Sequence, residues 1–218
     1  MPELDPAAAR AVADLLDEGF PPWHSLSVAG ARQLEAAAFA PTEPPPVEAV
    51  QDLAIDGPGG DLPLRIYRPE EVPAPTIVVC HGGGFLMGDL DTIDGLCLRL
   101  CRRAGAVVVS VDYRLAPEDP FPAAVEDATR ATAWVHDHAP SIGGDGDTLV
   151  VAGTSAGAAL ATVTAIHARD TGGPAIDHQV LAYPMTAISD DHPSRELDAP
   201  LLGGADVEWF WDTYLANP

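Results

Sequence analysis

Four short runs of apolar, mostly β-branched residues alternate with helical segments along most of the chain. The runs occupy residues 76–80, 106–113, 148–153 and 178–184. Continuous apolar runs of this length are typical of parallel strands that are buried on both faces. Helical patterns follow the first three runs, at about residues 92–104, 123–138 and 155–170. Strands that alternate with helices form right-handed crossovers, so we predict an α/β fold with a mostly parallel sheet and helices on both faces.

Further elements are predicted on either side of this alternating region. Residues 49–56 and 63–68 form two predicted strands that are joined by a glycine-rich turn. The whole chain therefore has six predicted strands, of which the last is 178–184. Residues 206–218 are predicted to form an aromatic-rich amphipathic helix.

The N-terminal part of the chain has a different pattern from the rest. A helix is predicted to begin at Pro6, and a second one covers about residues 27–39. Residues 40–46 are rich in proline and predict a stiff linker. We therefore divide the 218 residues into an N-terminal helical cap segment, 1–45, and an α/β core, 46–218.

The strongest chemical signal is the pentapeptide Gly153-Thr154-Ser155-Ala156-Gly157, which lies between a buried strand and a long helix. A G-x-S-x-G motif in this context forms a sharp turn that raises the serine above the carboxyl end of the sheet. The two glycines leave room for that turn. Ser155 is therefore the candidate nucleophile for acyl transfer. The alternative is a glycine turn with only a structural role.

The second signal is His81-Gly82-Gly83-Gly84, directly after the strand 76–80. Consecutive glycines allow backbone N–H groups to converge on an oxyanion without obstruction by a Cβ atom. We expect Gly83 and Gly84 to be donors of an oxyanion hole, with the N–H of Ala156 as a third. Gly82 is expected to form the turn, and His81 to support the loop rather than act as a general base. The alternative is a flexible glycine loop.

These motifs together resemble those of a known family. HGGGF at 81–85, DYRLAPEDPFPAAVED at 112–127 and GTSAGA at 153–158 are similar, in order and spacing, to the hormone-sensitive-lipase family of α/β-hydrolase carboxylesterases and lipases. The resemblance implies an α/β-hydrolase fold with a small N-terminal cap, hydrolysis of short- to medium-chain acyl esters, no cofactor and no metal. It also implies that the segment 112–118 is a structural brace in which Arg114 and Glu118 pair. Thr154 and Ala158 depart from the usual family motif.

The resemblance also points to a missing part of the catalytic machinery. The triad order in this fold is Ser, then Asp or Glu, then His, and the family takes the last two from loops after the seventh and eighth strands. Only six strands are predicted here, so the last two strands are expected to be absent and the chain to be C-terminally truncated. None of the later histidines and acids fits a triad position: His167, His178, His192, Asp190, Asp191 and Asp198. We therefore assign no triad Asp or His to this chain.

Three functions remain open from the sequence. The first is a serine carboxylesterase in truncated or partial form, and the second is a non-catalytic protein that binds a small molecule on the same fold. The third is an inactive remnant. A small apolar ester is the expected substrate, because large apolar residues accompany the cap and the glycine loop, although ordinary packing explains each of them equally well: Phe20, Trp23, Leu26, Leu34, Phe39, Phe85, Leu86 and Met87.

Composition narrows the partners and the compartment. The chain has 33 acidic and 11 basic residues and a net charge of -22, which disfavours a nucleic-acid partner. No apolar run is long enough for a membrane span, and the N-terminus does not resemble a signal peptide, so we expect a cytoplasmic protein. All the basic residues are Arg. A halophilic cytoplasm explains this acidity, and codon bias in a high-GC genome is the alternative.

An open sheet edge is expected if the last two strands are absent. The predicted strand 178–184 would then expose an unpaired apolar edge, through which two copies can associate. The three cysteines are Cys80, Cys97 and Cys101. Their odd, low number does not indicate a disulfide framework, which fits a reducing compartment.

Overall fold

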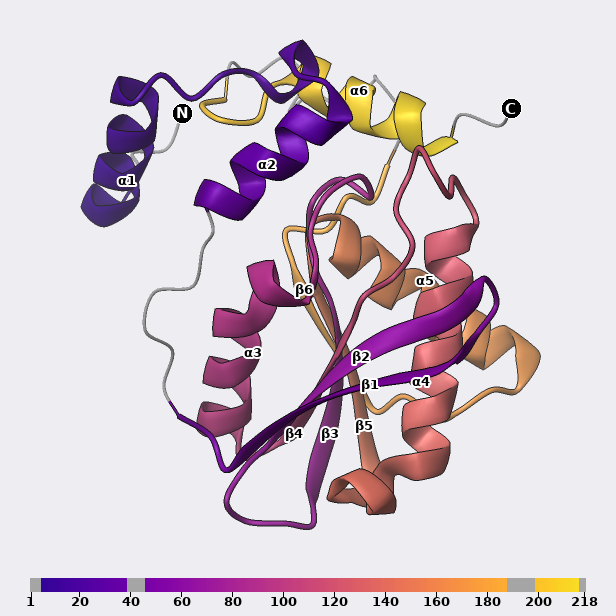
Figure 1. Cartoon of the computed structure of the whole chain (residues 1–218). Helices are drawn as coiled ribbons and strands as arrows, with labels where there is room; N and C mark the ends of the chain where they lie inside the picture. The colour runs from indigo at the N-terminus through magenta and orange to yellow at the C-terminus, as the bar shows by residue number, and fades with distance from the viewer. Residues whose placement is uncertain (1–4, 39–45, 188–198, 216–218) are drawn as a thin grey trace.

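The computed structural model describes residues 5–38, 46–187 and 199–215. Its centre is one six-stranded sheet in the order β1-β2-β4-β3-β5-β6 (Figure 1). The strands are β1 (Ala49–Gly57), β2 (Gly60–Arg68), β3 (Ala74–Cys80), β4 (Val107–Val111), β5 (Gly144–Thr154) and β6 (His178–Ala182). The β1-β2 and β2-β4 pairs are antiparallel, and the strands from β4 through β3 and β5 to β6 are parallel. The mostly parallel sheet predicted from the apolar runs is therefore confirmed.

Helices cover both faces of the sheet, as predicted. Figure 1 shows α3 (Leu90–Ala104) on one side, and α4 (Ala123–Ile142) and α5 (Ala156–Thr171) on the other. Successive side chains of β3 pack alternately against the helices on the two faces of the sheet, because residues alternate between the faces of a strand. Ile77 and Val79 belong to the core beside α3, whereas Val78 belongs to the core beside α4 and α5.

The helix limits follow local signals that are visible in the sequence. The Asp89 side chain accepts hydrogen bonds from the N–H groups of Asp91 and Thr92 and so caps α3. The predicted helix end at residue 138 is wrong, because α4 continues through Pro140 to Ile142. Gly143, with φ of +97°, ends it. A proline in the last turn loses one hydrogen bond but does not stop a helix that a glycine terminates shortly afterwards.

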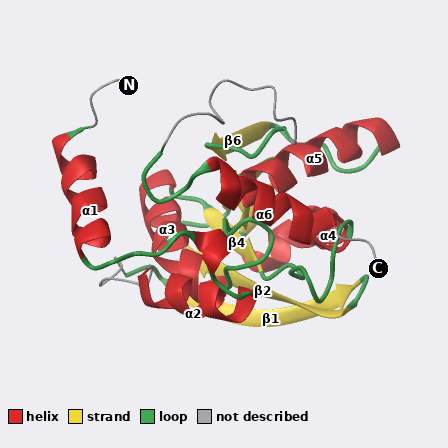
Figure 2. Cartoon of the chain, turned by 90° about the horizontal axis from the view of Figure 1, so that it is seen from above, coloured by secondary structure: helices red, strands yellow, loops and turns green. Residues whose placement is uncertain are grey.

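A cap lies above the carboxyl ends of the parallel strands. It contains α1 (Pro6–Asp17), the short 3-10 helix η1 (Trp23–Ser25), α2 (Val28–Ala38) and also α6 (Gly204–Leu215) (Figures 1 and 2). The division of the chain at residue 45 stays a prediction. In the structure, α6 lies with the N-terminal helices although it comes from the C-terminal part of the sequence. Most of the predicted linker, 40–46, lies outside the described residues.

Polar contacts hold α6 to the N-terminal segment. The Trp23 Nε1–H donates to the Leu201 carbonyl at 3.1 Å. The His24 backbone N–H and ring Nδ1 lie 3.0 and 2.7 Å from one carboxylate oxygen of Asp206. In addition, the Tyr214 ring stacks on Phe85 of the glycine loop, with ring centroids 3.9 Å apart. The two ends of the described chain therefore close over the same part of the sheet.

Strand β6 is one edge of the sheet in the described part of the chain. It pairs with β5 alone, and Val180 and Leu181 are 52% and 38% exposed. Beside it, α5 also leaves Val163 and Ile166 exposed. The expected open apolar edge is therefore present within these residues. A membrane-spanning helix is absent from the described residues.

Candidate active site

Ser155 occupies a sharp turn between β5 and α5. Its backbone has φ of +50° and ψ of −116°, a conformation that L-residues rarely adopt. A Cβ atom on Gly157 would collide with the carbonyl groups of Cys80 and His81, and one on Gly153 would collide with the Gly157 backbone. Only glycine fits at these two positions. The turn therefore has the geometry that the motif predicts, with the serine presented at the end of β5.

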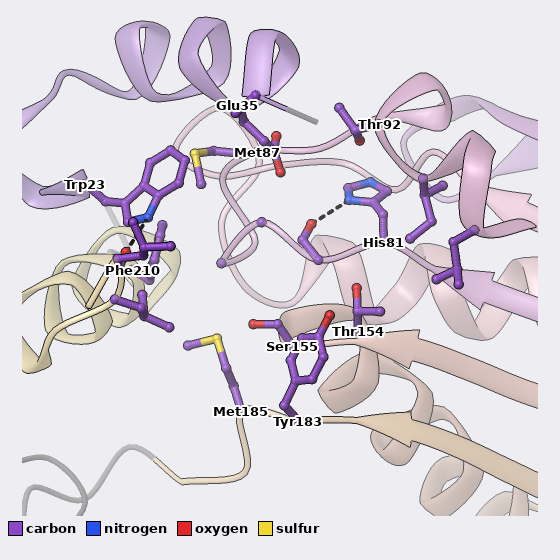
Figure 3. Close-up of a pocket in the computed structure, with 18 of the residues that line it drawn as sticks. Trp23, Glu35, His81, Met87, Thr92, Thr154, Ser155, Tyr183, Met185 and Phe210 are labelled. Atoms are coloured by element: carbon purple, nitrogen blue, oxygen red, sulfur yellow. Dashed lines mark hydrogen bonds between the residues drawn. The ribbon is translucent and has the colours of Figure 1, made fainter. Parts of the chain in front are cut away.

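Neighbouring backbone groups fix the Ser155 turn in place. The Ser155 N–H donates to the Ala182 carbonyl at 2.9 Å, and the Ser155 carbonyl accepts from the N–H groups of Ala158 and Ala159. The Met185 N–H also donates to this carbonyl, at 3.3 Å. The end of β6 therefore supports the turn from one side, which leaves the Ser155 side chain facing the cavity (Figure 3).

The glycine loop that follows β3 packs directly against the serine turn. A Cβ atom on Gly82 would lie 3.0 Å from Thr154 Oγ1, so the two segments are already in close contact. Gly83 and Gly84 have φ of +109° and +61°. Their Cβ atoms would collide with the Met87 carbonyl and with the Phe210 ring, respectively. The predicted flexible-loop alternative is disfavoured, because this loop is packed on all of these sides.

The geometry leaves backbone donors free near the serine. Within the described residues, the N–H groups of Gly83 and Gly84 have no hydrogen-bond acceptor, whereas the Gly83 carbonyl accepts from Leu86 and Met87 at 3.0 Å each. Ala156 is the first residue of α5, and the N–H groups of a first helical turn have no partner inside the helix. These three groups are therefore available for an oxyanion, as the sequence predicts, and that role remains a proposal.

His81 is part of the structural support of the glycine loop. It is fully buried, and its Nδ1 lies 2.7 Å from the Gly82 carbonyl, so Nδ1 carries the proton. The ring stacks on Tyr113 with centroids 4.2 Å apart, and the Tyr113 hydroxyl donates to the His81 carbonyl at 2.9 Å. Burial lowers the pKa of His81 to about 4. His81 is therefore neutral at pH 7 and held in place, which agrees with a supporting role.

The expected ion pair between Arg114 and Glu118 is wrong. Arg114 forms a bidentate pair with Asp127 at the start of α4, with distances of 2.9 Å from Nε and 3.0 Å from Nη2. Glu118 instead receives both Nη groups of Arg32, from α2, at 2.9 and 2.6 Å. The sequence places Glu118 near Arg114, but it contains no sign that a cap helix descends onto this segment.

Arg32, which no sequence pattern singles out, connects the cap to the site. Its Nε–H donates to the Leu86 carbonyl at 2.7 Å, and its Nη2 donates to the Ala116 carbonyl at 3.0 Å. Leu86 belongs to the segment that follows the glycines. One guanidinium therefore binds α2 both to the glycine loop and to the 112–118 brace, and only the tertiary structure reveals this.

A cavity of about 700 Å³ lies between the cap and the sheet, with Ser155 and the glycine loop in its wall (Figure 3). Phe20, Trp23 and Met87 line it, as predicted for an apolar pocket. The prediction is wrong for Leu26, Leu34, Phe85 and Leu86, which do not line the cavity because they pack into the core. Phe39 lies outside the described residues. Met185, Tyr183 and Phe210 are among the lining residues beyond the predicted set.

Glu35 is the one carboxylate that the described residues contribute to this cavity wall, and no sequence motif includes it. It comes from α2 and lies close to Gly83 of the glycine loop. Burial raises the pKa of Glu35 to about 7, the neighbouring Asp89 carboxylate adds to the rise, and the Gly88 backbone opposes it. An apolar wall and one partly protonated carboxyl therefore face the same space.

A base beside Ser155 is not present in the described part of the chain. No hydrogen bond there joins the Ser155 hydroxyl to a histidine or a carboxylate. His167 is on the exposed side of α5, and His178 begins β6. His192, Asp190, Asp191 and Asp198 lie outside the described residues. The absence of a triad Asp and His from the chain therefore stays a prediction.

Comparison with known proteins identifies the class to which this architecture belongs. Residues 77–218 match the family described as alpha/beta hydrolase fold. The chain belongs to that family, within its hormone-sensitive-lipase-like carboxylesterases.

Particular relatives carry esterase names. Esterase LipI of Mycobacterium tuberculosis is 53% identical over 159 residues, which is 70% of this chain and 50% of that protein. Carboxylesterase NlhH of the same organism is 37% identical, over 98% of this chain and 68% of its own length. An ester hydrolase from the metagenome of Lake Arreo superposes with a TM-score of 0.91 at 35% identity, covering 99% of this chain and 72% of that one. The chain spans about half the length of the curated relatives LipI and LipN.

Proposed function

We propose that the protein is a carboxylic ester hydrolase for short- to medium-chain acyl esters, with Ser155 as its nucleophile. The observation that supports this most strongly is the contact between the Ser155 turn and the glycine loop at the wall of one apolar cavity. Neither feature alone requires the other. Their juxtaposition supports a site in which the Ser155 hydroxyl and the N–H groups of Gly83, Gly84 and Ala156 act on one ester carbonyl, as acyl transfer demands.

The chemistry follows from these positions. The Ser155 Oγ forms a bond to the ester carbonyl carbon, and its proton passes to a general base, which the described residues do not supply. The carbonyl oxygen becomes an oxyanion that accepts hydrogen bonds from the N–H groups of Gly83, Gly84 and Ala156. The C–O bond to the alcohol then breaks, and the alcohol leaves with the proton. Water attacks the acyl-serine and releases the acid and free Ser155.

A second function has one observation in its favour. Among the described residues, no histidine or carboxylate is hydrogen-bonded to the Ser155 hydroxyl. The competing proposal is therefore a protein that binds a small apolar molecule in the 700 Å³ cavity without hydrolysing it. Serine without an adjacent base is a weak nucleophile. The two functions differ in one respect that can be measured, which is turnover that depends on Ser155.

The test is the hydrolysis of p-nitrophenyl acetate and butyrate by the unmodified chain and by Ser155→Ala. Ser141→Ala, at an exposed position on α4, is the matched control. Circular dichroism checks that all three fold. Release of p-nitrophenol that only Ser155→Ala abolishes supports the hydrolase. Binding of the esters with equal background release by all three chains supports the ligand-binding protein.

We also infer a cytoplasmic protein that takes no nucleic-acid partner. The net charge of -22 and the three free cysteines, of which all are buried, support this. We also propose a halophilic origin. In a salt-rich cytoplasm the repulsion between surface carboxylates would be screened, since the Debye length is about 3 Å at 1 M salt. Unfolding midpoints measured in a KCl series are then expected to rise with salt. A midpoint that stays constant contradicts the halophilic proposal.

Self-association is proposed at the open edge of β6. Val180 is 52% exposed there. Val50, on the opposite edge strand β1, is exposed to nearly the same extent, 50%, and serves as the matched control. A charged side chain on an edge strand opposes pairing between copies. Val180→Glu is therefore expected to shift the chain toward monomer in sedimentation velocity, and Val50→Glu is not. Equal behaviour of the two variants would remove β6 as the contact.

A further inference from the structure

Glu35 is placed to meet a bound molecule, although the proposed ester hydrolysis has no role for it. Figure 3 shows its carboxyl group extending from α2 toward the space beside the glycine loop. A methyl group built on Gly83 would lie 3.2 Å from Glu35 Oε1, so the carboxyl group reaches the loop that carries the oxyanion donors. A ligand whose carbonyl is near Ser155 therefore has its remaining part within the same cavity as this carboxyl.

No cation of the described residues neutralises Glu35. Arg32, on the same helix, is engaged by Glu118 and by two carbonyl groups. His81 is neutral near pH 7 because burial lowers its pKa to about 4. Arg99 of α3 lines the cavity but forms no ion pair with Glu35, and Asp89 adds charge of the same sign. On α6, Asp206 is held by His24. The carboxylate thus has no ion-pair partner among the described residues.

Aromatic rings surround the same space. Trp23 of η1 and Phe210 of α6 line the cavity with Glu35, and Figure 3 shows Trp23 beside Phe210, with Met87 between Trp23 and Glu35 in this view. Phe20 packs edge-on against Trp23, with centroids 5.1 Å apart. The face of an indole ring attracts a cation, and the attraction is strongest where water is excluded. Carboxylate and aromatic faces together are the two groups that bind an alkylammonium ion best in a protein.

We propose that the cavity selects ligands and ester substrates that carry an alkylammonium group, which binds in the space that the Glu35 carboxylate and the Trp23 ring both line. This inference deepens the proposed function and rests on it, because it concerns the same cavity. The net charge of -22 adds a long-range field that draws cations toward the protein.

The proposal has a pH signature whose sign follows from the charge. The carboxyl group with pKa of about 7 is protonated in acid and ionised in base. A cationic ligand binds the ionised form, so its affinity rises as the pH increases through 7 and falls below it. A neutral ligand of the same shape has no such dependence.

The test uses acetylcholine and its neutral isostere, 3,3-dimethylbutyl acetate, with calorimetry at constant ionic strength. Binding is measured in the Ser155→Ala background, so hydrolysis does not interfere. At pH 8 the cation is expected to bind about tenfold more tightly than the isostere, and the preference should disappear at pH 5.5. Glu35→Gln is expected to abolish the preference at pH 8. Glu208→Gln, an exposed carboxylate on α6, makes the same change in charge and should preserve it.

Each other outcome overturns the proposal. Equal affinities for the two ligands at pH 8, a preference that survives Glu35→Gln, or no binding of either ligand would each contradict it. The pH comparison in the Ser155→Ala chain decides the matter even if Glu35→Gln fails to fold. Failure of the proposed function is separate, because it appears as p-nitrophenyl ester hydrolysis that does not depend on Ser155, while the cation preference is measured by binding alone.

Discussion

The two walls of the cavity are built in different ways. On the sheet side, the Ser155 turn and the glycine loop are defined by backbone sterics, since added Cβ atoms at Gly83, Gly84 or Gly157 would collide with packed atoms. On the cap side, α2 and α6 are held by side-chain contacts, which are the polar contacts of Arg32 and His24 and the packing of Phe210 and Tyr214 of α6 into the core. Close backbone packing therefore fixes the site for chemistry, whereas the cap side of the cavity depends on side-chain contacts, which single substitutions can remove.

Breaking the sheet wall is expected to destabilise the protein most. Gly157→Ala places a methyl group against the Cys80 and His81 carbonyls, and neither backbone segment can move without disturbing the sheet. We expect a loss of about 3 kcal/mol in the free energy of unfolding, measured by urea denaturation. The control is Gly172→Ala, at the end of α5, where φ is +72° but no atom lies within 4 Å. If both variants lose the same free energy, the close packing of the turn is not the cause.

A smaller effect is expected from releasing the cap. Arg32→Ala removes two carbonyl contacts and the bidentate contact with Glu118, whose side chain is 59% exposed and so contributes little. We expect a loss of about 1–2 kcal/mol in unfolding free energy, mainly from the carbonyl contacts.

A more specific test of the Arg32 contacts is the local stability of α2. Limited proteolysis should cut α2 faster in Arg32→Ala while the sheet remains protected, because this guanidinium joins α2 to the glycine loop and to the brace. Arg10→Ala, at an exposed position on α1, is the control. Uniform loss of protection across cap and sheet would mean that the two walls are not separable in stability.

The smallest effect on stability is expected at the contact between η1 and α6, when the pH is lowered or Asp206 is replaced. Burial alone would raise the pKa of Asp206, but hydrogen bonds from the His24 and Gly203 amides and from the His24 ring lower it overall. A lowered pKa means that the contact stabilises the fold at pH values above the ordinary Asp range, near 4, and that this stabilisation disappears as the pH falls through the folded-state value.

Asp206→Asn should therefore flatten this acid dependence and cost about 1 kcal/mol at pH 7. Stability measured from pH 3 to 7 in both chains checks this, with Asp212→Asn on the exposed face of α6 as the matched control. An unchanged acid profile in Asp206→Asn would show that the cap contact does not involve this carboxylate.

The sheet wall could be predicted from the sequence, and the cap wall largely could not. Strands, crossovers and the glycine turns depend on local patterns, because apolar runs and the steric demands at Gly82 or Gly157 are visible in neighbouring residues. Arg32 and Asp206 act through partners that are 54 and 182 positions away. No periodicity or motif encodes such contacts. The Arg114–Glu118 expectation was wrong for the same reason, since a distant helix supplied the partner of Glu118.

An acyl-transfer site formed by Ser155 and the glycine loop should reveal itself when a diffusible base is supplied. The measurement is p-nitrophenyl butyrate hydrolysis by the unmodified chain and by Ser155→Ala, with and without added imidazole. We expect the unmodified chain to hydrolyse the ester faster than Ser155→Ala, with the greatest difference when imidazole is present. Identical rates for the two chains at every imidazole concentration, with both folded, would contradict the acyl-transfer site.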